Sequence, residues 1–264
     1  MVESLLYRIG RPLFFVSGLI EAVGRFFIFQ FHLIPLFFKR PFRFGLMVRQ
    51  LEAIGASSLL VVGLTAVFTG MVMAIQLYVA FNKFGAAEMM GYAIFLAIGR
   101  ELGPVFTALM LISRAVSAMA AELGTMRVTE QIDAIEVLSV DSRHYLMIPR
   151  IWAAIIAMPL LVMFFDVIAN LGAYLLAVYA LDVNPTAYMR TIYQFSEISD
   201  FMQGFVKGVV FGLVVSAIGT YVGYHARGGA KGVGEATTQA VVIASVALFL
   251  TNYFLSSLFL LLDW

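Results

Sequence analysis

A charged pentapeptide interrupts one of the most apolar stretches of the chain. Arg100-Glu101-Leu102-Gly103-Pro104 lies between the apolar runs 93–98 and 105–112. A charge inside a segment long enough to cross a bilayer costs roughly 2.5–3.5 kcal/mol on insertion scales, so it usually faces the protein interior or a wet cavity. Lys207 is the other charge deep in apolar sequence. We therefore predict that Lys207 pairs with Glu101, either as a structural ion pair that sets helix packing or as the polar lining of a substrate cavity.

The backbone at this pentapeptide should be bent or locally open. Pro104 has no N–H for the carbonyl of Arg100, four residues earlier. Consecutive helical residues point about 100° apart, so one of Arg100 and Glu101 could serve the interior and the other a neighbouring helix. Asp166 is a further acid in apolar sequence, which could pair with Asn170 or lie near the outer end of its helix.

Composition indicates an all-α integral membrane protein. The chain is 62% hydrophobic and 12% charged, against roughly 45–50% and 25% in soluble domains. Five segments are apolar enough to span, with edges uncertain by several residues. We place them near Leu51–Ala80, Gly91–Ser113, Ile148–Ala180, Phe201–Tyr224 and Ala236–Leu262. The first and third exceed about 20 residues, so they should tilt or extend beyond the hydrocarbon.

Several kinds of chemistry are not expected from this composition. Without cysteine there are no disulfides, thiolate metal sites or cysteine nucleophiles, and the net charge of +1 gives no support for nucleic-acid binding. The chain contains no Walker-type phosphate loop, so we expect it to bind no ATP itself. The three histidines are scattered without metal-ligand spacing, and no Ser/His/Asp set indicates a hydrolase. The start lacks the pattern of a cleaved signal peptide.

Residues 1–45 differ in character from the rest of the chain. They intersperse phenylalanines with basic residues, and Pro12, Pro35 and Pro41 interrupt any single continuous span. An aromatic, basic helix of this type can lie in the membrane interface. The alternative is a sixth crossing at about Leu13–Phe38. We expect an interfacial helix over 1–45 and a five-helix membrane-spanning domain over 46–264.

The distribution of basic residues orients the chain. With five crossings and a cytoplasmic N-terminus, the outer segments hold only Lys83 and Arg190, while most other Lys and Arg residues are inside. This orientation puts Arg114–Arg150 and His225–Glu235 in the cytoplasm. It puts Phe81–Met90 and Leu181–Asp200 outside.

Glycines recur at four-residue spacing in the fourth span. Gly204, Gly208 and Gly212 are followed by Gly219 and Gly223. Small residues in one row let helix backbones approach closely. The row predicts a packed seam, either inside the subunit or between two copies.

The cytoplasmic segment Met126–Leu138 has helical amphipathic periodicity. Its apolar stripe is Val128, Ile132, Ile135 and Leu138, and its acidic face is Glu130, Asp133 and Glu136. A helix this short is marginal alone in water. It should therefore lie against this protein's own membrane domain or against a separate cytoplasmic subunit.

Together these motifs resemble the MlaE permease family, the membrane subunits of ABC-type phospholipid transporters associated with MCE proteins. The resemblance is carried by Arg100–Pro104, Arg114, Ala121–Ala134 and Pro149-Arg150. It covers roughly residues 45–262 in segment order, with a dense core at 99–150. One departure is Asp141-Ser142, where the family usually has Asp-Pro, which leaves the loop after the amphipathic segment less rigid.

The resemblance implies a homodimeric permease of the bacterial inner membrane, with a cytoplasmic N-terminus, an interfacial helix and five spanning helices. It implies a separate cytoplasmic ATPase that uses ATP, an MCE-domain protein on the outer face, phospholipid as substrate and, in some assemblies, a small STAS-domain regulator. This chain would be a transport subunit and not an enzyme.

The resemblance also assigns roles to residues. Arg100, Glu101 and Lys207 match positions of the family's polar cavity and ion pair. Candidate acyl-chain contacts are Val72, Ile75, Leu77, Tyr78 and Leu102. The segment 126–138 would be the helix that couples to the ATPase, through Met126, Val128, Glu130, Ile132, Asp133, Ile135 and Leu138.

Two functions of other classes compete with this interpretation. An ion- or proton-coupled secondary carrier could use Glu101, Asp166 and Lys207 as a relay, but such carriers often show internal repeats and the sequence has no convincing one. A purely structural scaffold would leave the charged pair and the coupling segment unexplained.

Overall fold

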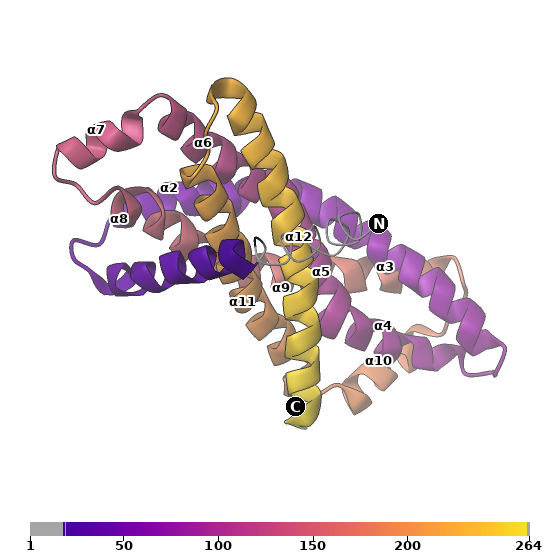
Figure 1. Cartoon of the computed structure of the whole chain (residues 1–264). Helices are drawn as coiled ribbons and strands as arrows, with labels where there is room; N and C mark the ends of the chain where they lie inside the picture. The colour runs from indigo at the N-terminus through magenta and orange to yellow at the C-terminus, as the bar shows by residue number, and fades with distance from the viewer. Residues whose placement is uncertain (1–17, 19, 263–264) are drawn as a thin grey trace, which may run out of the picture.

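The fold is a bundle of long helices (Figure 1). The computed structural model describes residue 18 and residues 20–262, and this part of the chain contains helices and no strands. Six helical stretches within it are long and apolar enough to cross a membrane. They are Ile20–Phe38, Phe44–Asn82, Ala87–Val128, Ser142–Tyr179, Ile198–Tyr224 and Gly229–Leu261. The all-α membrane fold class predicted from composition is therefore confirmed.

The N-terminal half of the chain consists of a helix over residues 20–33 and the elements that follow it. These are η1 (Ile34–Phe38), α2 (Phe44–Ile54), η2 (Ala56–Ser58), α3 (Leu59–Asn82), η3 (Ala87–Met89), α4 (Met90–Ala97), η4 (Ile98–Leu102), α5 (Gly103–Leu111), η5 (Ile112–Val116) and α6 (Ser117–Val128). Among them η4 and η5 are single π-helical turns, so the elements from α4 to α6 form one continuous, irregular rod.

The C-terminal half contains α7 (Gln131–Val137), α8 (Ser142–Leu146), α9 (Ile148–Tyr179), α10 (Pro185–Phe195), α11 (Ile198–Tyr224) and α12 (Gly229–Leu261). The predicted third and fourth spans match α9 and α11 within a few residues. The predicted second span was too short, since its helix continues past Ser113 to Val128. The reason is that the π-turn η5 admits Arg114 and keeps the rod helical, while Met119, Ala120 and Leu123 of α6 pack into the bundle.

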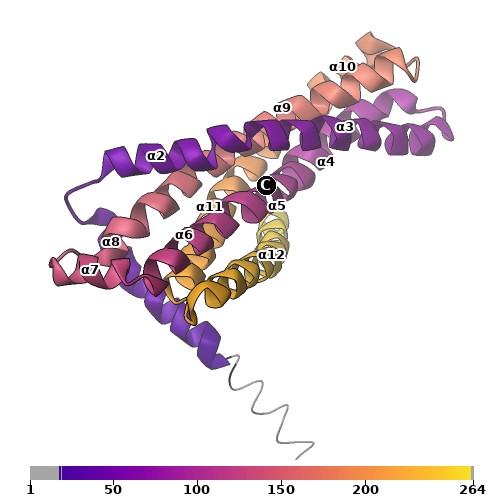
Figure 2. The same ribbon diagram turned by 90° about the horizontal axis from the view of Figure 1, so that it is seen from above.

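Helix α9 is the central element of the bundle. It is buried along most of its length and packs against α2, α3, α5 and α11. Figure 2 shows α2 and α3 following one another along one side of α9, while α11 separates α9 from α12. One apolar core joins α5, α9, α11 and α12, and a second joins α3, α4, α9 and α10.

The glycine row of α11 forms its seam within the subunit. A Cβ on Gly208 would lie 2.9 Å from the Cα of Pro159, and one on Gly212 would lie 2.6 Å from the carbonyl oxygen of Ala154, both in α9. Gly204 faces the backbone of Gly99 in η4 just as closely. The close approach of α11 to α9 therefore requires glycine, which decides between the two predicted locations of the seam.

The N-terminal helix contacts the end of one long helix and the start of another. The rings of Phe26 and Phe29 meet Tyr221 edge-on at centroid distances of 5.1 and 5.2 Å, near the C-terminus of α11. Phe37 meets Trp152 at 5.6 Å, near the N-terminus of α9. Nε2 of His144, in α8, lies 3.1 Å from the carbonyl oxygen of Lys39. The helix thus lies at the end of the bundle that also carries α8.

Candidate functional site: a polar cluster inside the bundle and a cytoplasmic docking tip

The ion pair predicted between Glu101 and Lys207 is present. Nζ of Lys207 lies 2.8 Å from Oε1 of Glu101, and the lysine side chain is fully buried. The same ammonium donates hydrogen bonds of 2.8 Å to the carbonyl of Arg100 and to the hydroxyl of Ser256. Its three donor positions are thereby used, which is what a charge buried in a membrane protein requires.

The π-helical turn η4 explains how Lys207 reaches a backbone carbonyl inside another helix. Pro104 cannot donate to the carbonyl of Arg100, as the sequence predicted, and the turn around this carbonyl widens to a π-helix. Lys207 from α11 donates to the carbonyl in place of the missing N–H. A side chain thus repairs the backbone interruption that the proline creates.

Arg100 and Glu101 form ion pairs with different residues, and both of these partners lie on α11. Nε of Arg100 donates a 2.7 Å hydrogen bond to Oδ1 of Asp200, and NH2 also pairs with that oxygen. Asp200 is buried in the first turn of α11, where its other carboxylate oxygen accepts from the N–H of Glu197. Sequence reasoning assigned Asp200 to an outer loop and missed this role. The capping-box spacing of Glu197 and Asp200 was the available signal.

Two polar side chains of α12 complete the environment of Glu101. Nδ2 of Asn252 donates to Oε2 at 3.0 Å, and the hydroxyl of Ser256 donates to Oε1 at 2.8 Å. Sequence reasoning missed both, although their four-residue spacing puts them on one face of an apolar helix. Despite these partners the Glu101 side chain is 45% exposed. The cluster therefore joins three helical segments and presents its carboxylate at the open side of the subunit.

Asp166 does not take part in the polar cluster. It is buried in α9, and its Oδ1 packs against Gly103 without a hydrogen-bond partner among the described residues. Asn170 does contact this residue, as one predicted alternative had it, but its Nδ2 donates to the backbone carbonyl of Asp166 at 2.8 Å and not to the carboxylate.

The candidate acyl-chain contacts do not share one face of α3. Val72 and Ile75 are 54% and 46% exposed and point away from the bundle, whereas Leu77 and Tyr78 pack against the core shared with α4 and α9. Treating the four as a single face was wrong, because five residues advance a helix by about 500°, which leaves Leu77 about 140° from Val72. Leu102 is half-buried next to Glu101.

The segment 126–138 is not one helix, which corrects the prediction. Helix α6 ends at Val128, Glu130 has a left-handed backbone with φ of 60°, and α7 begins at Gln131. An ion pair of 2.6 Å between Arg127 and Asp133 bridges the break. The apolar periodicity is real, but it runs through a sharp turn that redirects the second half of the segment.

The apolar residues of the segment lie in two environments, and the change between them comes within α7 and not at the turn. Ile132 is fully buried against Leu123 and Leu146, and Ile135 and Met126 pack at the edge of that cluster. Val137 and Leu138 are 84% and 75% exposed at the far end of α7. Of the two predicted supports, the protein's own helices hold the first part of the stripe.

Glu136 ties α7 to the rest of the protein. Its Oε1 accepts hydrogen bonds from the hydroxyls of Ser142 at 2.6 Å and Tyr224 at 3.0 Å. The hydrogen bond from Ser142 holds the pKa of this carboxyl below its usual range. Ser142 stands at the position where the resemblance led us to expect proline, and its hydroxyl also lies 2.8 Å from that of Tyr224. Ser142, which belongs to α8, therefore links this helix to α7 and α11.

Comparison with known proteins decides the family. The family model described as Permease MlaE matches residues 47–258. The chain belongs to the MlaE permease family. A probable ABC transporter permease protein of Rickettsia bellii is 45% identical to this MlaE-family permease over 241 residues, which cover 91% of this chain and 93% of the relative. The intermembrane phospholipid transport system permease protein MlaE of Haemophilus influenzae is 36% identical over 216 residues, covering 81% and 83% of the two chains.

Family membership and the six apolar helices together make this chain a multi-pass membrane protein with a transport role. The MlaE match includes η4, η5, α6 and α7, so the polar cluster and the exposed tip at Val137 and Leu138 lie within the family region. The part of the chain that the structure describes has no group of three His, Asp or Glu side chains that could hold a metal ion.

Proposed function

We propose that this MlaE-family chain is the permease subunit of an ABC-type transporter that moves phospholipid between a bacterial inner membrane and an MCE-protein carrier on its outer face. The observation that carries the proposal is the Glu101–Lys207 pair, a charged group in the apolar bundle whose carboxylate end remains open. The Haemophilus influenzae relative, whose name specifies phospholipid transport, supports the choice of substrate.

The polar cluster has the chemistry to guide a lipid headgroup past an apolar wall. Glu101 offers acceptor oxygens at the open side, and Arg100 has a side chain that is 33% exposed beside it. A zwitterionic or anionic headgroup can exchange hydrogen bonds with these two groups while the acyl chains stay against apolar helix surface. Lys207 holds the carboxylate of Glu101 in position, so the polar site is ready before a lipid arrives.

The transporter is proposed to be a homodimer, with the open side of the polar cluster facing the second copy. The chain itself binds no cofactor, and a separate cytoplasmic ATPase uses the ATP. A small STAS-domain regulator is a further proposed partner. The ATPase contact is assigned to the exposed apolar tip, Val137 and Leu138, because Ile132 and Ile135 are already used inside this chain.

The N-terminus is proposed to be cytoplasmic, with the first helix lying in the membrane interface. Its aromatic contacts are to the last turns of α11 and the first turns of α9. Those turns flank α7 and α8, the region that the positive-inside rule assigns to the cytoplasm. Nε2 of Gln30 also donates to the carbonyl oxygen of Ala217, so the contacts with α11 lie in the C-terminal part of that helix. These contacts support a helix that crosses the bundle near its cytoplasmic end.

Lipid transport by a charge-free variant tests the proposal. Glu101→Gln with Lys207→Met removes both charges and leaves no unpaired ion, so the protein should assemble. In proteoliposomes with the ATPase and MCE partners, we expect lipid transport to fall about tenfold or more, equivalent to about 1.4 kcal/mol of lost transition-state stabilisation.

A matched control applies the same two substitutions to an exposed pair. Lys231 and Glu235 form an ion pair of 3.7 Å on the surface of α12, with side chains 89% and 61% exposed. Glu235→Gln with Lys231→Met should transport lipid normally, since exposed pairs contribute little. Full transport by the Glu101 and Lys207 double variant would leave the cluster with a packing role only and refute its place in the lipid path.

A further inference from the structure

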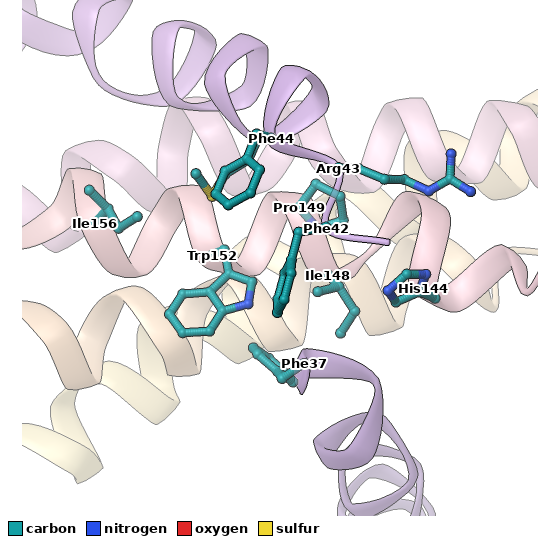
Figure 3. A pocket seen from close by; sticks show the side chains of 10 residues that line it. Phe37, Phe42, Arg43, Phe44, His144, Ile148, Pro149, Trp152 and Ile156 are labelled. Atoms are coloured by element: carbon teal, nitrogen blue, oxygen red, sulfur yellow. The ribbon is translucent and has the colours of Figure 1, made fainter. Parts of the chain in front are cut away.

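An apolar cavity of about 280 Å³ lies at the α8 end of the bundle, away from the polar cluster (Figure 3). It is formed where residues 39–43, the connecting segment between η1 and α2, meet α8 and the first turns of α9. The lining residues are Phe37, Phe42, Arg43, Phe44, Met47, His144, Ile148, Pro149, Trp152 and Ile156. Its volume is close to the ~300 Å³ lower bound of ordinary ligand pockets, so it suits one chain-like apolar group.

The cavity is apolar along most of its length. Trp152 and Ile156 of α9 form one wall, and the rings of Phe42 and Phe44 face them from the connecting segment and the start of α2. Phe42 and Phe44 remain 47% and 64% exposed. The exposed rings at the rim leave the hollow open to an acyl chain of the surrounding membrane.

Two nitrogen-containing side chains, Arg43 and His144, line one end of the cavity. Figure 3 shows Arg43 and His144 at the same end, with Ile156 at the other. Nε of Arg43 is buried and has no hydrogen-bond partner among the described residues, while its guanidinium stacks 4.4 Å from the ring centre of Tyr145. The guanidinium has further N–H donors besides Nε, and its fork geometry matches the oxygens of a phosphate.

The surroundings favour an anion at this end. Lys39 and Arg40 are exposed on the loop that leads to Arg43. The adjacent carboxylate, Asp141, is occupied by the side chain of Arg143 at 3.5 Å and by the backbone N–H groups at the start of α8. Basic residues near a membrane surface attract anionic lipid by about 1 kcal/mol each.

We propose that this cavity is a binding site for one anionic phospholipid of the cytoplasmic leaflet. An acyl chain lies between Trp152 and the phenylalanine rings, and the phosphate accepts hydrogen bonds from the guanidinium of Arg43. His144 lies beside it, with its Nε2 on the carbonyl oxygen of Lys39. The bound lipid attaches the connecting segment to α9 and is not the transported molecule. The site does not depend on the proposed transport path, and only the choice of leaflet rests on the proposed topology.

The location supports this separation from the polar cluster. The cavity reaches along α9 only as far as Ile156, whereas Gly103, beside the cluster, packs against Asp166 ten residues further on. Gly208, the neighbour of Lys207, packs against Pro159, three residues beyond Ile156, so the near edge of the cluster is about 5 Å further along α9 than the cavity. The cavity and the Glu101–Lys207 pair therefore lie at neighbouring levels of α9, and neither Glu101 nor Lys207 lines the cavity.

Tryptophan fluorescence tests the site directly. The chain has two tryptophans, so Trp264→Phe leaves Trp152 as the reporter in the cavity wall. The protein is reconstituted in phosphatidylcholine vesicles that contain a small fraction of lipid with brominated acyl chains, which quench tryptophan on contact. We expect brominated phosphatidylglycerol to quench Trp152 at a several-fold lower fraction than brominated phosphatidylcholine. Equal quenching by the two lipids would overturn the proposal.

Substitutions then locate the anion. Arg43→Ala with His144→Ala should remove the preference for phosphatidylglycerol, while Arg49→Ala should retain it, because Arg49 is an exposed basic residue of α2 outside the cavity. Loss of the preference in both variants would indicate a general charge effect and refute the site. Ile156→Phe, which narrows the apolar end without changing charge, should reduce quenching by both lipids. Unchanged quenching in this variant would contradict insertion of the acyl chain.

Discussion

A single methyl group at Gly208 should separate the two central helices. Gly208→Ala places its Cβ 2.9 Å from the Cα of Pro159 and 3.3 Å from two further atoms of that proline. Ordinary Cβ contacts begin near 3.4 Å, so α11 must move from α9 by about 0.5 Å. The obstacle is a proline backbone, which cannot rotate away as a flexible side chain would.

The magnitude follows from two opposed effects. Overpacking of a close-packed interior costs about 1–3 kcal/mol, and the helix preference of alanine over glycine returns up to about 1 kcal/mol. We expect Gly208→Ala to lower the free energy of unfolding by about 1–2 kcal/mol, a factor of roughly 5–30 in the folded-to-unfolded ratio.

Gly234→Ala is the matched control. Gly234 lies inside α12, and a Cβ there would meet no atom within 4 Å. This substitution should stabilise the protein by about 0.5–1 kcal/mol, since only the helix preference acts. The assay is unfolding of the purified permease in mild detergent by added dodecyl sulfate, and the two variants should fall on opposite sides of the wild type. Equal stability of the two variants would refute the seam as the cause.

Three further predictions concern the ion pair, the docking tip and the N-terminal helix. Lys207→Met should lower the free energy of unfolding by about 2–3 kcal/mol. This is less than for a fully buried pair, because Glu101 is half-exposed. Adding Glu101→Gln in the same chain should restore most of the lost stability. Val137→Asp with Leu138→Asp should abolish co-purification of the ATPase and leave the amount of permease unchanged, because both side chains are exposed. A cysteine at Val2, before the possible crossing, in a chain without native cysteine, should react with an impermeant reagent from the cytoplasmic side.

Each of these has a result that would contradict it. Continued instability of the Glu101 and Lys207 double variant would mean that the stranded charge is not the cause. Normal ATPase recovery with both tip substitutions would refute docking at α7, and Ile132→Asp provides a contrast because it should destabilise the permease itself. Labelling of Val2 from outside would establish a sixth crossing.

The sequence alone was sufficient for the features that depend on composition and local chemistry. Apolar length predicted the spans of α9 and α11, because a bilayer demands about 20 apolar residues. Pro104 predicted an opening of the helix at Arg100, because proline has no backbone N–H in any fold. The pairing of Glu101 with Lys207 followed from the cost of isolated charges, since few candidate partners existed in apolar sequence.

Only the tertiary structure decided which residues share each site. Asp200 contacts Arg100 across 100 residues of sequence, and Asn252 and Ser256 contact Glu101 across 151 and 155 residues. No local pattern specifies such contacts. The apolar periodicity also gave no sign of the break at Glu130, because a left-handed residue can redirect a helix without interrupting its apolar spacing. Whether Ile132 faces a partner or its own chain depended on where Leu123 and Leu146 lie. That is a property of the packed bundle and not of the segment.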